Sequence, residues 1–249
     1  GFPAPRPLAP PAALPGGSAT FEQYLDAGSP ADPRDPAQRD RMARSLARLV
    51  RLCQPFVERD ALEAWMVPQR GELWPEPHDR RFDFPATVRG AEWIDAVAAR
   101  ALATLADPRG QAVVGHNDWR REHLRFQQGV LSAVHDWDSL GRFPEPVLVA
   151  GAARTYPADW TLEGHRQYPT LEEMRAFVRS YEVERGTPFT PGEHRTLWAA
   201  VAYGAAYTAR CEHSDDRTGY GNGPLVPTPA AIPAGSMRGF LLAHADELL

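Results

Sequence analysis

The side chains best suited to catalysis gather in one short segment near the middle of the chain. This segment, from Ala112 to Leu140, contains three histidines and three aspartates: His116, Asp118, His123, His135, Asp136 and Asp138. Carboxylates can accept a proton from an attacking hydroxyl group, and they can hold a divalent cation. Mg²⁺ in particular prefers oxygen ligands, usually one or two carboxylates together with substrate phosphates. These residue types therefore indicate acid–base or metal-assisted chemistry.

Short apolar runs flank these side chains and predict the elements that hold them. Residues 112–114 are predicted to form a buried strand that ends at Gly115, while residues 123–126 and 130–134 are predicted to form a hairpin. Its turn contains Gly129, where a positive φ is expected. A lone aspartate after a strand is most often a turn residue. Here the hairpin returns the chain, so Asp118 and Asp136 are expected to come close together on a rigid scaffold.

Two motifs in this segment resemble those of a known family. His116-Asn117-Asp118, followed after four residues by His123, resembles the H-x-D-x-x-x-x-N loop of the aminoglycoside phosphotransferase family, which has a protein-kinase-like fold. Residues 135–138, H-D-W-D, resemble the family's metal-binding D-W segment. The resemblance implies an ATP- and Mg²⁺-dependent phosphotransferase that moves the γ-phosphate of ATP to a hydroxyl group of a small molecule. It makes Asp118 the catalytic base, His116 a brace for its loop, and Asp136 the ligand of Mg²⁺ on the ATP phosphates.

The chain departs from the family pattern at one cofactor ligand. The family's Asn, which gives an oxygen to Mg²⁺, falls on His123 here, so the resemblance assigns His123 together with Asp136 to the nucleotide and metal site. Imidazole nitrogen suits Mg²⁺ less well than oxygen, and Asp138 is a hypothetical compensating ligand. The family also receives cationic substrates on acidic groups of late helices. That makes Glu212, Asp215 and Asp216 weak substrate-binding candidates, against their ordinary interpretation as a solvated turn.

Composition narrows the class of protein. The 249 residues carry a net charge of -5, which implies no general affinity for nucleic acid. The two cysteines form no disulfide pattern, no apolar stretch is long enough for a membrane span, and no secretory signal opens the sequence. We therefore expect a cytoplasmic protein with a small-molecule substrate, whose oligomeric state the sequence leaves open. All 27 basic side chains other than histidine are arginines.

The Pro-rich opening has two interpretations. It can be a flexible, polyproline-like linker. By the resemblance, residues 2–8 are instead a strand late in the small ATP-binding lobe, just before the hinge. Residues 1–18 would then be a remnant of the small lobe and hinge, and residues 19–249 the large lobe. The absence of lysine agrees with this, because the phosphate-contacting lysine of the family would lie upstream. The expected fold class is α+β and helix-rich: a protein-kinase-like large lobe with a small central β-hairpin region, and a small lobe largely missing.

Helical periodicity and capping signals predict the remaining elements. Helices are expected over residues 19–26, 37–54, 61–66, 90–106, 147–156, 170–184, 190–211 and 235–248. Thr170 and Thr190 each open a helix with a glutamate three residues later, which is a capping box. Residues 141–146 are expected to break the chain, and Glu212 to Asp216 to close the preceding helix. The long irregular stretch over residues 67–85 holds aromatics that are expected to pack on the large lobe.

Two other functions remain open at this point. A metal-dependent hydrolase could use His116, Asp118, His123, His135 and Asp136 around two metals. A non-catalytic, kinase-like remnant would keep the fold without activity. Within the first interpretation, the acceptor is open among aminoglycosides, macrolides, choline-like alcohols and sugars, because a family does not fix a substrate.

Overall fold

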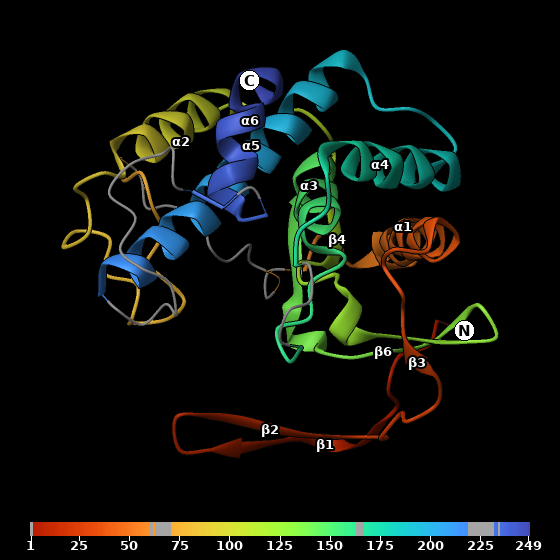
Figure 1. Ribbon diagram of the computed structural model, residues 1–249. Helices are drawn as coiled ribbons and strands as arrows, with labels where there is room; N and C mark the ends of the chain where they lie inside the picture. Colours follow the sequence, from red (N-terminus) through yellow and green to blue (C-terminus); the bar gives the residue numbers. More distant parts are fainter. Residues whose placement is uncertain (1, 60–61, 63–70, 163–166, 219–231, 234) are drawn as a thin grey trace.

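Helices dominate the computed structural model, which describes residues 2–59, 62, 71–162, 167–218, 232–233 and 235–249 (Figure 1). The helices in these ranges are α1 (Pro36–Cys53), α2 (Glu92–Leu105), α3 (Glu145–Thr155), α4 (Leu171–Arg185), α5 (Pro191–Thr218) and α6 (Met237–Leu248). Every one of them is too short or too polar to cross a lipid bilayer. With the small sheets described below, they confirm the expected α+β, helix-rich class.

Helix α5 is the centre of the helical layer. It packs against α2, α3 and α6, while α4 packs against α1 and α3. Its inward face is made of Leu197, Val201 and small residues such as Ala202 and Ala205, all fully buried. Small side chains let neighbouring helices approach closely, and close packing of this kind is where the dispersion energy of a core comes from.

Two small antiparallel sheets lie between the helices. Strand β4 (Ala112–His116) pairs with β7 (Leu140–Pro144), with His116 opposite Leu140. Strand β5 (Leu124–Gln127) forms a hairpin with β6 (Val130–Val134), and the short β3 (Ser29–Pro30) pairs with the other edge of β5. The hairpin was predicted, and its turn has φ 49° at Gln128 and 76° at Gly129. Two successive positive φ angles are typical of a tight hairpin whose twist matches its strands.

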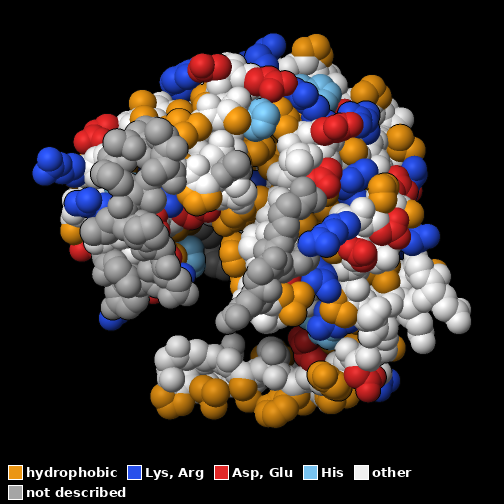
Figure 2. All heavy atoms as spheres, viewed as in Figure 1, with side chains coloured by type: hydrophobic (Ala, Val, Ile, Leu, Met, Phe, Trp, Pro, Cys, Tyr) orange, Lys and Arg blue, Asp and Glu red, His pale blue; other side chains and the backbone are white. Residues whose placement is uncertain are grey.

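A third sheet is a separate hairpin that projects away from the helices. Strands β1 (Pro7–Leu14) and β2 (Gly17–Glu22) pair antiparallel, with register shifts between Pro7 and Ala9 and between Ala9 and Ala12. The second shift spans Pro10-Pro11, whose prolines have no N–H to donate. Figure 2 shows apolar side chains along its outer edge, and Leu8, Leu14 and Phe21 are all exposed. From Pro7 onward the Pro-rich opening is therefore sheet rather than a linker, whereas residues 2–6 of the predicted strand over 2–8 form none.

Three local predictions are wrong. The helix expected over residues 19–26 is strand β2 and an irregular segment, because pairing with β1 satisfies its backbone groups instead. Residues 140–144 form β7 rather than a break, since β4 offers an unpaired edge. Helix α5 continues to Thr218 instead of ending at Cys211, so Glu212, Asp215 and Asp216 lie within it. The other predicted helices match to within a few residues at their ends, except that the turn over 61–66 lies outside the described residues. The division of the chain after residue 18 stays a prediction.

Candidate active site

Two loops carry the predicted catalytic residues, and backbone hydrogen bonds tie them together. Residues 117–123 connect β4 to β5, and residues 135–139 connect β6 to β7. The N–H of Asn117 donates to the carbonyl of Ser139 at 2.9 Å, and the N–H of His135 donates to the carbonyl of His123 at 2.9 Å. The two sheets therefore end side by side, which places the loop of Asp118 against the loop of Asp136.

The side chain of His116 bridges these two loops and holds them together. Its ring is fully buried, Nδ1 accepts the N–H of Asp118 at 3.2 Å, and Nε2 lies 2.9 Å from the carbonyl of His135. Since Nδ1 accepts, the proton of a neutral ring belongs on Nε2, which donates to that carbonyl. Burial lowers the pKa of His116, against a smaller opposing effect of the bond to His135. A neutral imidazole is thus the bridge between the two loops, which supports the predicted bracing role.

Trp119 anchors the first loop to helix α1. Its indole is fully buried and its Nε1–H donates to the carbonyl of Met42 at 3.0 Å. The indole also meets the ring of His116 edge-on, with centroids 5.8 Å apart. A buried indole N–H needs such a partner, so this single side chain sets the loop's distance from the helix behind it.

Asp136 lies on an uncommon backbone conformation. Its φ is 64° and its ψ is 46°, a left-handed geometry that aspartate tolerates better than most residues. The hydroxyl of Ser139 donates to Oδ2 at 2.7 Å. Partial burial acts to raise the pKa of Asp136, but this hydrogen bond and the nearby His123 outweigh it, so the pKa lies below its ordinary value. A strained residue with a stabilised carboxylate is a common feature of functional sites.

The carboxylates of Asp118 and Asp136 come together around His123, as the hairpin predicted. Nε2 of His123 lies 3.1 Å from Oδ2 of Asp118 and 3.8 Å from Oδ2 of Asp136, and one ligand atom from each of the three residues falls within 4.8 Å of the others. Arg120 contributes a guanidinium nitrogen 2.9 Å from Oδ2 of Asp118.

This donor set fits one divalent cation. The two carboxylates suit Mg²⁺ or Mn²⁺, whereas the imidazole is the less suitable ligand for Mg²⁺. Asp138 is exposed and lies outside the set, so its role as a ligand stays a prediction. Within the described part of the chain no second group of metal-binding side chains forms, and both ring nitrogens of His116 already face backbone groups. The arrangement therefore offers nothing in favour of a two-metal hydrolase.

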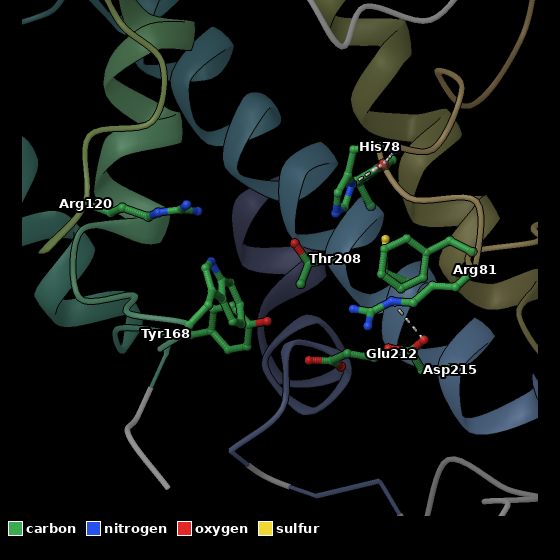
Figure 3. A pocket seen from close by; sticks show the side chains of 11 residues that line it. His78, Arg81, Arg120, Tyr168, Thr208, Glu212 and Asp215 are labelled. Atoms are coloured by element: carbon green, nitrogen blue, oxygen red, sulfur yellow. Dashed lines mark hydrogen bonds and ion pairs between the residues drawn. The ribbon is translucent and has the colours of Figure 1, made fainter. Parts of the chain in front are cut away.

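A cavity of about 580 Å³ has Arg120 in its wall (Figure 3). Its walls include the aromatic side chains Phe82, Trp160, Tyr168 and Tyr207. Arg120 and Arg81 approach it from opposite sides, with Thr208 of α5 between them. Because Arg120 also contacts Asp118, the cavity is connected to the predicted catalytic base by one side chain. Its volume is typical of a small-molecule site.

The three acidic residues proposed for substrate binding have different positions. Glu212 and Asp215 line the cavity, whereas Asp216 is paired with Arg238 and is not among the lining residues. Both carboxylate oxygens of Glu212 accept backbone N–H groups of Met237 and Arg238, at 2.9 and 3.0 Å, so this residue caps helix α6. Asp215 lies 3.5 Å from Arg81. Burial raises the pKa of both Glu212 and Asp215.

Several residues of the site have no signal in the sequence motifs. Arg120 is an unspecified position of the first motif and Ser139 follows the second, but only the folded loops show which carboxylate each contacts. His78 and Phe82 come from the aromatic stretch over residues 67–85, whose expected packing is confirmed where it is described: Phe82 and Phe84 are buried and Tyr207 lies 2.9 Å from Nδ1 of His78. Residues 67–70 of that stretch lie outside the described residues.

The fold and the two adjacent loops are those of a protein-kinase-like large lobe. Comparison with known proteins gives the family of the chain. A model of the phosphotransferase enzyme family matches residues 1–144. The chain belongs to this family, which confirms the resemblance stated from the two motifs. No curated protein sequence matches it.

Solved structures share the fold at low sequence identity. A protein of Ralstonia eutropha JMP134, provisionally assigned as an aminoglycoside phosphotransferase, is 12% identical with a TM-score of 0.59, over 99% of this chain and 79% of its own. A choline/ethanolamine kinase family protein from Mesorhizobium loti is 13% identical with a TM-score of 0.54, over 98% and 74%. An amicoumacin kinase in complex with AMP-PNP, Ca²⁺ and its ligand is 12% identical with a TM-score of 0.51, over 100% and 72%.

Proposed function

We propose that this chain is an ATP- and Mg²⁺-dependent phosphotransferase that moves the γ-phosphate of ATP to a hydroxyl group of a small molecule. The observation that carries the proposal is the cluster of Asp118, His123 and Asp136, whose ligand atoms lie within 4.8 Å of one another beside a ligand-sized cavity. The amicoumacin kinase of similar fold was solved with an ATP analogue and a divalent cation, which supports the same pair of cofactors here.

In this proposal Asp118 acts on the acceptor. Its contacts with Arg120 and His123 both use Oδ2, so Oδ1 is the oxygen available to take the proton of an incoming hydroxyl group. Arg120 holds the carboxylate in place through its contact with Oδ2. Since the backbone N–H of Asp118 is bound to His116, the whole group is fixed before the substrate arrives, and fixed geometry is the main contribution a phosphotransferase makes.

Asp136 and His123 would hold the cation, with Asp118 at its other side. A bound Mg²⁺ would neutralise charge on the ATP phosphates. The acceptor would lie in the cavity between Arg120 and α5, where Tyr168, Tyr207 and Phe82 offer flat surfaces and Thr208 a hydroxyl group.

The test is a calorimetric titration of ATP into the chain with and without Mg²⁺. We expect binding that requires Mg²⁺ and is lost in Asp136→Asn. Asp138→Asn is the matched variant, from the same loop but outside the cluster, and we expect it to bind as the wild type does. Equal loss in both variants would make Asp138 a ligand as well.

Turnover is then measured as ADP release with a panel of hydroxyl acceptors. Asp118→Asn should remove the acceptor-dependent signal and retain nucleotide binding. A chain that binds no Mg²⁺–ATP and releases no ADP with any acceptor would contradict the proposal and leave a non-catalytic protein of this family.

A further inference from the structure

Arg154, near the end of helix α3, is a partly buried cation with no acidic partner in the part of the chain that the structure describes. One of its guanidinium nitrogens donates to the hydroxyl of Thr208 at 3.0 Å, and no carboxylate lies within 4 Å of it among the described residues. Other sheltered arginines in the same lobe are paired. Arg185 lies 3.0 Å from Glu145, and Arg210 lies 3.3 Å from Asp95. Compared with these two arginines, Arg154 has no such pairing among the described residues.

A second cavity lies next to this guanidinium. It measures about 180 Å³ and is lined by Asn117 and Arg154 together with mostly apolar residues of α3 and α5. The side-chain amide of Asn117 has no hydrogen-bond partner among the described residues, and it comes from the loop that carries Asp118. The guanidinium of Arg154 and the side-chain amide of Asn117 thus line the same small space.

Helix α5 is adapted to leave room for the arginine. A Cβ atom on Gly204 would lie 2.7 Å from Nε of Arg154, closer than real contacts allow. Glycine in a helix interior is less stable than alanine by roughly 0.5–1 kcal/mol. Its presence at this point of a 28-residue helix therefore marks a place where the guanidinium must fit against the helix backbone.

The charged guanidinium of Arg154 would be stabilised by an anion beside it. Burial lowers its pKa, with the field of Asp118 among the influences that oppose this, but arginine remains protonated in proteins. A sheltered charge is unfavourable unless it is paired. The planar fork of a guanidinium matches carboxylate and phosphate oxygens in pairs.

We propose that this second cavity binds a small anionic group, a carboxylate or a phosphate, on Arg154 and the side-chain amide of Asn117. The group can be a free anion or an anionic substituent of the acceptor. The second source is open because Tyr207 lines both cavities and Thr208, which lines the larger one, is hydrogen-bonded to Arg154. The site needs neither ATP nor Mg²⁺, so it stands or fails independently of the proposed reaction.

The first experiment is a titration of inorganic phosphate, and separately of acetate, into the nucleotide-free chain at constant ionic strength, followed by calorimetry and by thermal unfolding. We expect saturable binding of at least one anion to the wild type, weakened at least ten-fold in Arg154→Gln. Arg179→Gln on α4, an exposed arginine, is the matched control and should bind as the wild type does.

A second variant guards against a mere folding defect. Thr208→Asp places a carboxylate where Arg154 now meets a hydroxyl group, so it should abolish anion binding while raising the unfolding temperature. Absence of saturable binding by the wild type, or equal binding by the wild type and Arg154→Gln, would overturn the proposal.

The source of the anion is then decided with pairs of acceptors that differ by one carboxylate. If the group belongs to the acceptor, Arg154→Gln should raise the KM of the anionic member of a pair alone, and phosphate should compete with it. If the anion is free, both members should respond to the variant equally.

Discussion

Asp136 combines a proposed ligand role with an unusual backbone conformation. Its left-handed conformation costs an ordinary L-residue about 1–2 kcal/mol, and the chain maintains it in a loop of five residues between two strands. The conformation turns the carboxylate toward His123 and Ser139 rather than along the strand. Substitutions at this position can therefore measure the effect of the backbone conformation separately from the effect of the carboxylate.

Two substitutions of Asp136 should differ in stability. Asp136→Gly and Asp136→Ala both remove the carboxylate and its bond to Ser139, but only alanine retains the Cβ that disfavours a positive φ. We expect Asp136→Gly to be the more stable of the two by about 1 kcal/mol, because glycine adopts this conformation without strain. Urea unfolding measures the difference. Equal stabilities would mean that the loop does not hold the left-handed conformation in solution.

Cys211 should be chemically inert although it lines the larger cavity. Burial raises the pKa of its thiol to about 12, with the charge of Asp215 adding to the effect. At pH 8 only about one molecule in ten thousand would then carry the reactive thiolate. Mass spectrometry after treatment with iodoacetamide should find this thiol unmodified in the native chain and modified in urea. Rapid alkylation of the native chain would show that the cavity is more polar than its walls indicate.

At the scale of elements, local signals decided which predictions succeeded. Helix α4 begins with a capping box in which Thr170 and Glu173 exchange bonds, and it ends at Gly186 with φ 89°. Both ends could be predicted because all of the residues that define them are adjacent in the sequence. The hairpin of β5 and β6 was predictable for the same reason.

The failures all depended on partners that are distant in the sequence. A threonine near acidic and polar residues locally favours the start of a helix. Here, however, the backbone groups of strand β2 pair with β1 instead. The end of α5 looked like a solvated turn, but Arg81 and Arg238 come from other segments and pair with its acidic residues. In the site, the proximity of Asp118 and Asp136 followed from the hairpin, whereas Arg120, Trp119 and Arg154 acquire their roles only through packing.

The caps of α4 and α5 offer a test of these local signals. Thr170→Ala and Thr190→Ala each remove a hydroxyl group that accepts the N–H of a glutamate three residues later. Each should lower the free energy of unfolding by about 1 kcal/mol. Ser18→Ala, in the exposed turn region of the first hairpin, is the control and should change it by less than about 0.5 kcal/mol. Similar effects in all three variants would deny the caps a specific role.

At the scale of the whole molecule, the histidines determine how the stability of the folded chain depends on pH. Burial lowers the pKa of His78, His116, His135 and His213 below its ordinary value of 6.5. The unfolded chain therefore takes up protons at these positions before the folded chain does, and stability is lost as the pH falls below about 6.5. The raised pKa values of Glu212 and Asp215 act in the opposite direction as the carboxylates begin to titrate.

The urea midpoint should consequently fall between pH 7.5 and pH 5.5, with four histidines acting together against two acids. His116→Gln, which keeps a polar side chain but no titratable ring, should reduce this pH dependence even if it lowers the midpoint at every pH. A midpoint that is constant over the range, or that rises toward pH 5.5, would contradict the assignment of neutral buried imidazoles.

The spacing along α5 limits how this protein can change over evolutionary time. Gly204, Thr208 and Glu212 follow one another at intervals of four residues, and they make room for Arg154, bond to it, and cap α6. A helix turns by about 100° per residue, so an in-frame deletion of a single codon between them would rotate the later positions away from all of their partners at once. Point substitutions in the cavity wall leave this spacing unchanged, whereas a change in the length of this helix segment alters every contact beyond it.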